Sequence, residues 1–122
     1  MLFLGGKGDF AQQPTPTAKS ASATLTIAEL LTGIVTTSGT VAMTLTLPTG
    51  TLTDAGVTAP ALPVNGCFDW GVINTGTVSA AATMAAGTGH TIVGAAGVAI
   101  GTSAGFRTRK TAANTFVTYR IR

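Results

Sequence analysis

Hydrophobic and polar side chains alternate along several short stretches of the chain. In residues 41–47 every second side chain is a large apolar one, and those between them are alanine or threonine. A period of two is typical of a β-strand that buries one face. Pro48 then ends the strand, because proline has no N–H to donate to a neighbouring strand. This stretch therefore predicts a strand that anchors a sheet.

Similar patterns recur between turn signals along the rest of the chain. They predict further strands at residues 23–27, 34–37, 67–74, 80–85, 90–93, 98–100, 105–111 and 115–121. Phe68, Trp70 and Val72 share one face of the strand that looks most buried. About seven to nine short strands separated by turns predict an all-β fold, either an antiparallel β-sandwich or a jelly-roll-like barrel.

Two short helical turns are predicted from the spacing of capping residues. Thr51 and Asp54 have the spacing of a capping box, in which each side chain bonds the other residue's backbone N–H, and Gly56 is placed to end the turn. Asp54 is then a cap that braces one end of the sandwich, and we expect Asp54→Ala to lower stability. Thr26 and Glu29 repeat the same spacing.

Residues 1–22 have the character of an extended N-terminal arm in front of a domain formed by residues 23–122. A Pro-Thr-Pro centre favours an extended path, and the flanking Gly, Gln and Ser residues offer little to a core. The arm also holds four large apolar side chains, those of Leu2, Phe3, Leu4 and Phe10. Such side chains are costly to leave in water, so we expect them to contact a neighbouring subunit or the assembly that the protein decorates.

The composition predicts a subunit of an assembly. A chain of 122 residues fits one domain, and its charged residues make up only 9%, against about 25% in ordinary soluble domains. So few charges leave large uncharged areas of surface, and we therefore expect an oligomer. Cys67 is the single cysteine, which suits assembly in a reducing cytoplasm. It has the character of a small core or interface residue.

The positive charge is concentrated near the C-terminus. Five of the seven cations are Arg107, Arg109, Lys110, Arg120 and Arg122. The plain interpretation of this basic strip is a solvated outer face of two strands, and the alternative is contact with an acidic protein neighbour. Nucleic acid is not expected, because no aromatic side chains are interleaved in a way that would stack bases.

No catalytic, cofactor or metal site is predicted. His90 is the only histidine and is interpreted as a solvated loop residue, although His90, Asp69 and some serine would form a triad on paper. The GGKGD sequence at residues 5–9 departs from the phosphate-loop pattern, since Lys7 is followed by glycine. We therefore expect neither an enzyme nor a protein that binds a small-molecule substrate.

No membrane partner is expected either. No segment reaches the roughly 18 apolar residues of a membrane span. The opening MLFL gives way to glycine too early for a signal peptide.

The texture and order of five segments resemble small virion proteins of tailed bacteriophages, the head decoration or cement proteins. The segments are TLTIAELLTGIVT, TLTLPTG, FDWGVINTG, GHTIVG and FRTRKTAANTFVTYRI, which together span about residues 23–122. The resemblance implies a β-rich homotrimer on the outside of the capsid, where it bridges neighbouring copies of the major capsid protein, often with a terminal arm as a latch. It also implies a virion protein that is assembled in the host cytoplasm.

The alternative from a different class is a receptor- or glycan-binding domain of a phage tail fibre. Such a domain needs an exposed aromatic platform. Trp70 is the only tryptophan and Tyr119 the only tyrosine, and both lie in strand patterns that look buried. This pattern favours the decoration protein over the fibre domain.

Overall fold

A computed structural model of the chain describes residues 11–58 and 61–122. It is mostly strand (45%) with little helix (10%), which confirms the prediction of a mainly-β fold. In the described residues there are ten strands and two short helices. The expected strands at Ile34–Thr37, Cys67–Asn74 and His90–Val93 form with the predicted ends.

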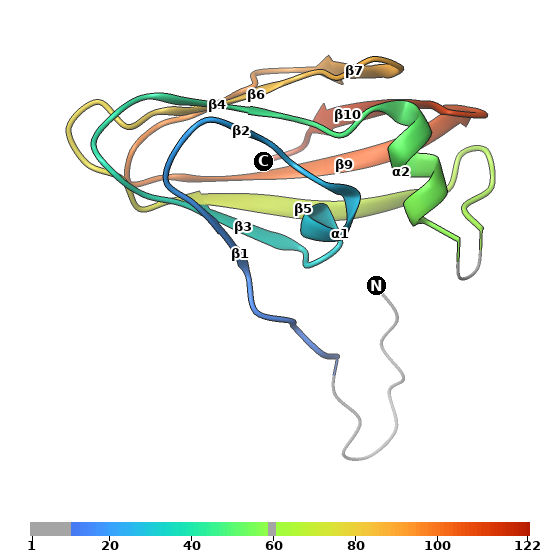
Figure 1. The fold of residues 1–122 in the computed structure, drawn as a ribbon, viewed down its shortest axis with the longest axis horizontal. Coiled ribbons are helices and arrows are strands. Elements are labelled where there is room, and N and C mark those ends of the chain that lie inside the picture. Colours follow the sequence, from blue (N-terminus) through green and yellow to red (C-terminus); the bar gives the residue numbers. More distant parts are fainter. Residues whose placement is uncertain (1–10, 59–60) are drawn as a thin grey trace.

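The strands are divided between two sheets (Figure 1). The larger sheet has the order β1 (Thr17–Lys19), β3 (Ile34–Thr37), β5 (Cys67–Asn74), β9 (Ser103–Ala112), β10 (Thr115–Arg120) and β7 (His90–Val93). The smaller sheet has the order β2 (Ala23–Thr24), β4 (Met43–Thr46), β6 (Ala82–Ala85) and β8 (Gly97–Val98). The helices α1 (Ile27–Leu30) and α2 (Gly50–Gly56) both lie toward one end of the strands, at the right of Figure 1.

Both sheets are mixed, so the prediction of purely antiparallel pairing is wrong. From β1 to β8 the chain changes sheet after every strand. Neighbours such as β1, β3 and β5 therefore run parallel, as do β2, β4 and β6. Antiparallel pairs join β5 to β9, β9 to β10, and β6 to β8. Alternation along one strand shows which side is buried but not which distant strand lies beside it, and for this reason the sequence pattern missed the parallel pairs.

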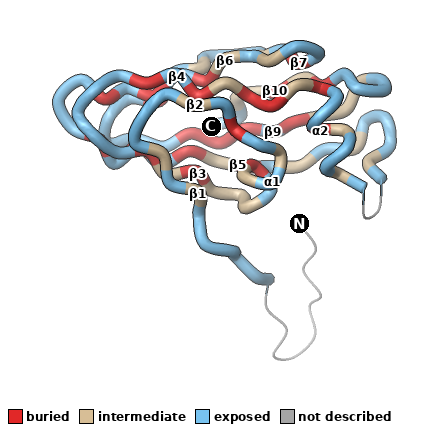
Figure 2. Tube along the Cα trace, viewed as in Figure 1, coloured by how far each residue is buried: buried red, intermediate tan, exposed pale blue. Residues whose placement is uncertain are grey.

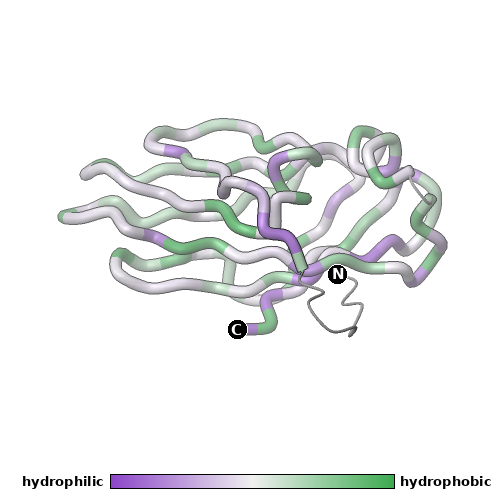
Figure 3. The backbone as a smooth tube through the Cα atoms, turned by 90° about the horizontal axis from the view of Figure 1, so that it is seen from below, coloured by the Kyte–Doolittle hydropathy of each residue, from purple (hydrophilic) through white to green (hydrophobic). Residues whose placement is uncertain are grey.

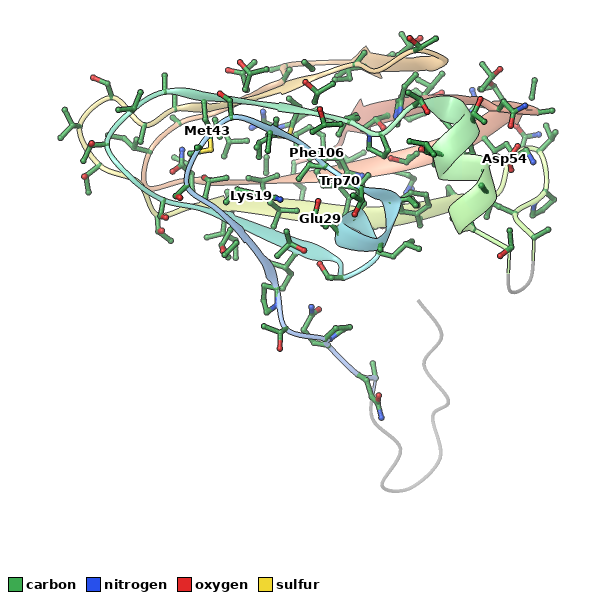
Figure 4. The ribbon with its side chains drawn as sticks, in the orientation of Figure 1. Lys19, Glu29, Met43, Asp54, Trp70 and Phe106 are labelled. Carbon is green, nitrogen blue, oxygen red and sulfur yellow. The ribbon has the colours of Figure 1, made fainter. Side chains whose placement is uncertain are left out.

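The two sheets share one hydrophobic core. Figure 2 shows buried segments on strands of both sheets. The core includes Val35, Trp70, Val72, Phe106, Met43, Leu45, Ala82 and Val98. The rings of Trp70 and Phe106 stack with centroids 4.7 Å apart in the interior (Figure 4). Within the described residues neither sheet closes into a barrel, and a sandwich or jelly-roll assignment stays a prediction.

The strand predicted at residues 41–47 is shorter than expected but buries the expected side. Met43, Leu45 and Leu47 are at most 3% exposed. Val41 is 72% exposed, because β4 begins only at Met43. The alternating pattern therefore identified the buried face, but it placed the start of the strand two residues too early and its end one residue too late.

Part of the predicted arm belongs to the larger sheet. Residues 17–19 form β1, which pairs in parallel with β3. Lys19 also forms an ion pair of 2.8 Å with Glu29 (Figure 4). The segment Thr-Ala-Lys carries no apolar alternation, so nothing local in the sequence indicated a strand there.

The capping box predicted for the first helical turn is confirmed. Glu29 N–H donates to the Thr26 hydroxyl, and Thr26 N–H donates to the Glu29 carboxylate. Helix α1 follows immediately and buries Leu30.

The capping box predicted for the second turn is wrong. Helix α2 is capped by Thr49, whose hydroxyl accepts from Leu52 N–H. Gly50, the first residue of this helix, packs against the backbone of Asn114, where a Cβ would collide. Asp54 instead accepts from Lys110 and from Asn114 N–H, and so ties α2 to the β9–β10 turn.

Candidate functional site

The face of the larger sheet that points away from the core is a candidate contact surface, and we call it the outer face. The strand register aligns its side chains in rows across β5, β9 and β10. One row joins Asp69, Arg107 and Tyr119, and the next joins Cys67, Arg109 and Val117. Trp70 and Phe106 belong to the opposite, buried face, because successive side chains of a strand point to opposite sides.

Asp69 and Arg107 form a bidentate ion pair on the outer face. Arg107 Nε and Nη2 donate to the two carboxylate oxygens of Asp69 over 2.6 and 2.9 Å. The hydrogen bonds from Arg107 lower the pKa of Asp69, and the same bonds raise the pKa of Arg107. Both side chains are nearly half exposed, so this pair orders the surface more than it stabilises the fold.

Arg109, the second cation of the outer face, is held by uncharged partners. Its Nε and Nη2 donate to the Tyr119 hydroxyl over 3.0 and 2.7 Å, and its Nη1 donates to Asn65 Oδ1. The guanidinium also lies over the Tyr119 ring, 5.6 Å from its centroid. Tyr119 therefore does not form an open aromatic platform.

The five cations of the predicted basic strip do not lie on one face. Arg107 and Arg109 share the outer face, whereas Lys110 Nζ pairs with Asp54 over 2.9 Å at the end of the sheet. Arg120 lies opposite Phe106 in the register, with its guanidinium over that ring. Strand register thus brings Arg107 and Arg109 together on the outer face, and Arg122 joins them there beyond the end of β10.

The outer face also contains a depression with a glycine floor. Gly71 of β5 lies directly opposite Gly105 of β9. The depression has a volume of about 340 Å³, and Ile34, Ile73 and Arg122 are among the residues that line it. Arg122 lies over Gly105, since a Cβ at that glycine would be 2.8 Å from its guanidinium. Glycine inside a strand pattern signals such a close approach, and this is the signal by which the sequence could have indicated the site.

His90 is buried, so its interpretation as a solvated loop residue is wrong. Its side chain is 6% exposed and belongs to a chain of hydrogen bonds that crosses the inner face of the larger sheet. Nδ1 carries the proton, because its partner is the Pro48 carbonyl, which only accepts. Nε2 then accepts from the Thr118 hydroxyl.

The same chain continues to the only tryptophan. Thr118 and Thr108 are joined by a hydroxyl–hydroxyl bond of 2.8 Å, and Trp70 Nε1 donates to Thr108 over 3.0 Å. Burial lowers the pKa of His90, and the bond to Pro48 opposes this shift. The neutral imidazole therefore completes a directional chain in which each donor has an acceptor. The role of this chain is to satisfy buried polar groups.

The triad drawn from His90 and Asp69 is excluded by the fold. Asp69 points to the outer face, where Arg107 holds it, whereas His90 lies on the core side of the same sheet. The imidazole Nδ1 faces a backbone carbonyl and not a carboxylate. The sequence did not indicate that the two side chains lie on opposite faces of the sheet. They belong to different strands, β5 and β7, which are not neighbours in the sheet.

The remaining predicted residues are placed as follows. Cys67 is exposed at the start of β5, so a core position is wrong and an interface position stays a prediction. The four apolar arm residues Leu2, Phe3, Leu4 and Phe10 lie outside the described residues.

Two further observations concern metals and membranes. Across residues 11–58 and 61–122, no group of three or more His, Cys, Asp or Glu side chains is placed to hold a metal ion. In the same part of the chain, no helix is long and apolar enough to cross a membrane.

Comparison with known proteins found no matching family model, curated protein or solved structure.

Proposed function

We propose that this chain is a structural virion protein that binds the outside of a bacteriophage capsid. It binds as a homotrimer and bridges copies of the major capsid protein. The observation that carries the proposal is the pairing of the acidic side chains within the molecule. Every Asp and Glu side chain in the described residues has a cation of the same chain as its partner. The pairs are Glu29 with Lys19, Asp54 with Lys110, and Asp69 with Arg107.

Internal pairing leaves a surface that is suited to permanent protein contact. Figure 3 shows most of the chain near the middle of the hydropathy scale, with few strongly hydrophilic positions. Ile73 and Val93 on the outer face are 42% and 49% exposed. Burying such a surface against another subunit removes apolar area from water and leaves few isolated charges to desolvate.

The proposed mechanism is stabilisation by mass action. A protein that binds only the mature form of a shell lowers the free energy of that form by its own binding free energy. Because the contribution is repeated over many copies and shared between neighbouring capsomers, modest contacts add up to a shell that resists internal pressure.

The test is a binding experiment on shells made from the major capsid protein encoded with this chain. We expect the purified protein to sediment as a trimer and to bind these shells in hundreds of copies. Ile73→Asp on the outer face should reduce binding by at least about tenfold, because it places a charge in an apolar contact. Leu52→Asp is the matched control, since Leu52 is 59% exposed on α2 and away from the outer face.

Two outcomes would overturn the proposal. One is that the wild-type protein sediments as a monomer and does not bind the shells. The other is a few to dozens of copies per particle together with a positive glycan array, which would support the tail-fibre alternative. Trp70 is buried in its stack with Phe106, and Arg109 engages Tyr119, so the described aromatic residues offer little platform for a sugar.

A further inference from the structure

Three loops meet at the end of the strands that is opposite the two helices, and we call this end the loop end. The loops are residues 38–42 between β3 and β4, residues 75–81 between β5 and β6, and residues 99–102 between β8 and β9. They form the left end of the molecule in Figure 1, and Figure 2 shows this end as mostly exposed.

Asn74, the last residue of β5, ties the loops together from below. Its side chain is 2% exposed, and its amide Nδ2 donates to the Ala80 carbonyl over 2.9 Å. Its backbone N–H donates to the Thr102 carbonyl, also over 2.9 Å. The loop of residues 38–42 is joined by Thr77 N–H, which donates to the Gly39 carbonyl over 2.9 Å. A buried, bonded network therefore holds the side chains of the loop end in fixed positions.

Each of the three loops exposes one large apolar side chain. Val41 is 72% exposed, Val78 76% and Ile100 39%. Val41 and Val78 are the most exposed large apolar side chains in the described residues. Apolar surface in water costs free energy, and several such side chains on one surface mark a place of contact with another molecule.

Val78 is also in a backbone conformation that valine rarely adopts. Its φ is 62°, in the left-handed region, where a β-branched residue is a genuine outlier and glycine is free of strain. Ala80 N–H donates to the Thr77 carbonyl, so Val78 occupies a central position of a tight turn. Its side chain neither fills the core nor suits this turn. Strained residues cluster at binding sites, and this valine therefore points to a contact outside its own chain.

The charge of the loop end indicates which partner it fits. The three loops contain no Asp, Glu, Lys, Arg or His, whereas the helix end holds the pair of Asp54 and Lys110. Lys19, whose carbonyl accepts from Ser38 N–H at the base of the first loop, is already paired with Glu29.

An uncharged end is complementary to a copy of itself. In an oligomer with rotational symmetry, each residue close to the axis faces the same residue of the other copies. A charged side chain in that position would face like charges, which is costly. The loop end avoids this cost and offers apolar side chains for burial.

We propose that the loop end is the surface through which copies of this chain bind one another, with Val41, Val78 and Ile100 packed around the symmetry axis. This inference deepens the proposed function and rests on its oligomer, because a monomer has no such axis. It assigns the contact between copies to the loop end and leaves the outer face for the shell. Burying Val78 at the axis removes apolar surface from water, which offsets the strain of its backbone.

Sedimentation velocity of full-length variants tests the inference. Val78→Asp should raise the dissociation constant of the oligomer at least about a hundredfold, because it places like charges around the axis. Aspartate adopts the left-handed region more readily than valine, so the variant should stay folded, and thermal unfolding checks this. Leu52→Asp adds the same charge on α2 at the helix end and should sediment as the wild type. Equal dissociation constants for the two variants would overturn the inference.

Val78→Gly separates a contact from a role in the fold. Glycine relieves the backbone strain, so in dilute solution the variant should unfold at about the wild-type temperature. Its dissociation constant should still rise about tenfold, because the buried valine side chain is lost. A lower unfolding temperature with an unchanged oligomer would overturn the inference.

A disulfide measurement tests whether the loop ends of different copies are adjacent. In a Cys67→Ser background, Val78→Cys should give a disulfide-linked dimer on a non-reducing denaturing gel after oxidation at a concentration at which the protein is oligomeric. Leu52→Cys in the same background is the control and should remain a monomer on the gel. The absence of a dimer from Val78→Cys would overturn the inference.

The results for sedimentation and for shell binding distinguish this inference from the proposed function. An oligomer that binds shells and is unchanged by Val78→Asp would overturn the inference alone. An oligomer that Val78→Asp dissociates but that binds no shells would support the inference and overturn the proposed function. A wild-type monomer would overturn both.

Discussion

The two faces of the larger sheet are built from the same strands and have opposite characters. On the inner face Trp70, Val72 and Phe106 are at most 2% exposed, and a chain of hydrogen bonds runs from Trp70 through two threonine hydroxyls to His90. On the outer face Asp69 and Arg107 pair while nearly half exposed, beside a depression floored by glycine.

The difference separates the residues that make the fold from those available for contact. Inner side chains fill space that water cannot enter, so their removal leaves a cavity or an unpaired polar group. Outer side chains contact water in both the folded and the unfolded chain. Replacing one therefore changes the surface but alters the free energy of unfolding little. Substitutions on the two faces should therefore differ in kind as well as in size.

The largest expected effect is on the inner face. Phe106→Ala should lower the free energy of unfolding by about 3–5 kcal/mol, because it removes a fully buried ring from its stack with Trp70. Ile73→Ala on the outer face of the adjacent strand is the matched control and should cost less than about 1 kcal/mol. Urea unfolding monitored by tryptophan fluorescence measures both values. Equal costs would contradict the division between the faces.

An intermediate effect is expected from His90 and depends on pH. Burial lowers the pKa of His90 in the folded protein below its unfolded value of about 6.5, so below that pH the unfolded chain binds a proton that the folded chain refuses. Stability should be constant above about pH 6.5. Below it, stability should fall by up to about 1.4 kcal/mol per pH unit until the folded pKa is reached.

The His90 prediction is measured by urea unfolding between pH 5 and 7.5. In His90→Gln the slope between pH 5 and 6.5 should disappear, even if the variant is less stable at every pH. Glu29, Asp54 and Asp69 add little to this slope, because their pKa values are lowered in the fold and the stability that they contribute is lost only as the pH falls below their unfolded values of about 4. A wild-type protein whose stability is level across this range would show that the buried imidazole is not neutral in the fold.

The smallest expected effect is on the outer face. Asp69→Asn removes the charge of the pair with Arg107 and should cost no more than about 1 kcal/mol after solvent screening. The difference from wild type should shrink further in 1 M NaCl, because salt screens exposed charges. Urea unfolding at low and high salt measures it. A cost as large as that of Phe106→Ala would mean that the outer face supports the fold.

Local patterns predicted the elements that depend on neighbouring residues. The capping box of Thr26 and Glu29 forms as expected, since both partners lie within one helical turn. The burial of Trp70 and Val72 also follows from period-two alternation within β5. In contrast, Thr51 and Asp54 have the same spacing and form no box, because Gly50 and Asp54 are engaged with the distant residue Asn114.

The candidate sites were predicted only in part. Arg107 and Arg109 lie together on the outer face, as alternation along their strand indicates. The depression floored by Gly71 and Gly105 depends on which strands are neighbours. A single sequence carries that information only weakly.

The amino-acid sequence by itself determined that the protein is mainly β, which side of most strands is buried, and that its charges are few. These properties arise from the spacing of side chains along one strand or one turn of helix. Tertiary structure alone decided the parallel pairing, the burial of His90 beside Thr118, and the partners of Asp54. Each of these depends on contacts between residues far apart in the chain, and such contacts are selected by the packing of the whole core.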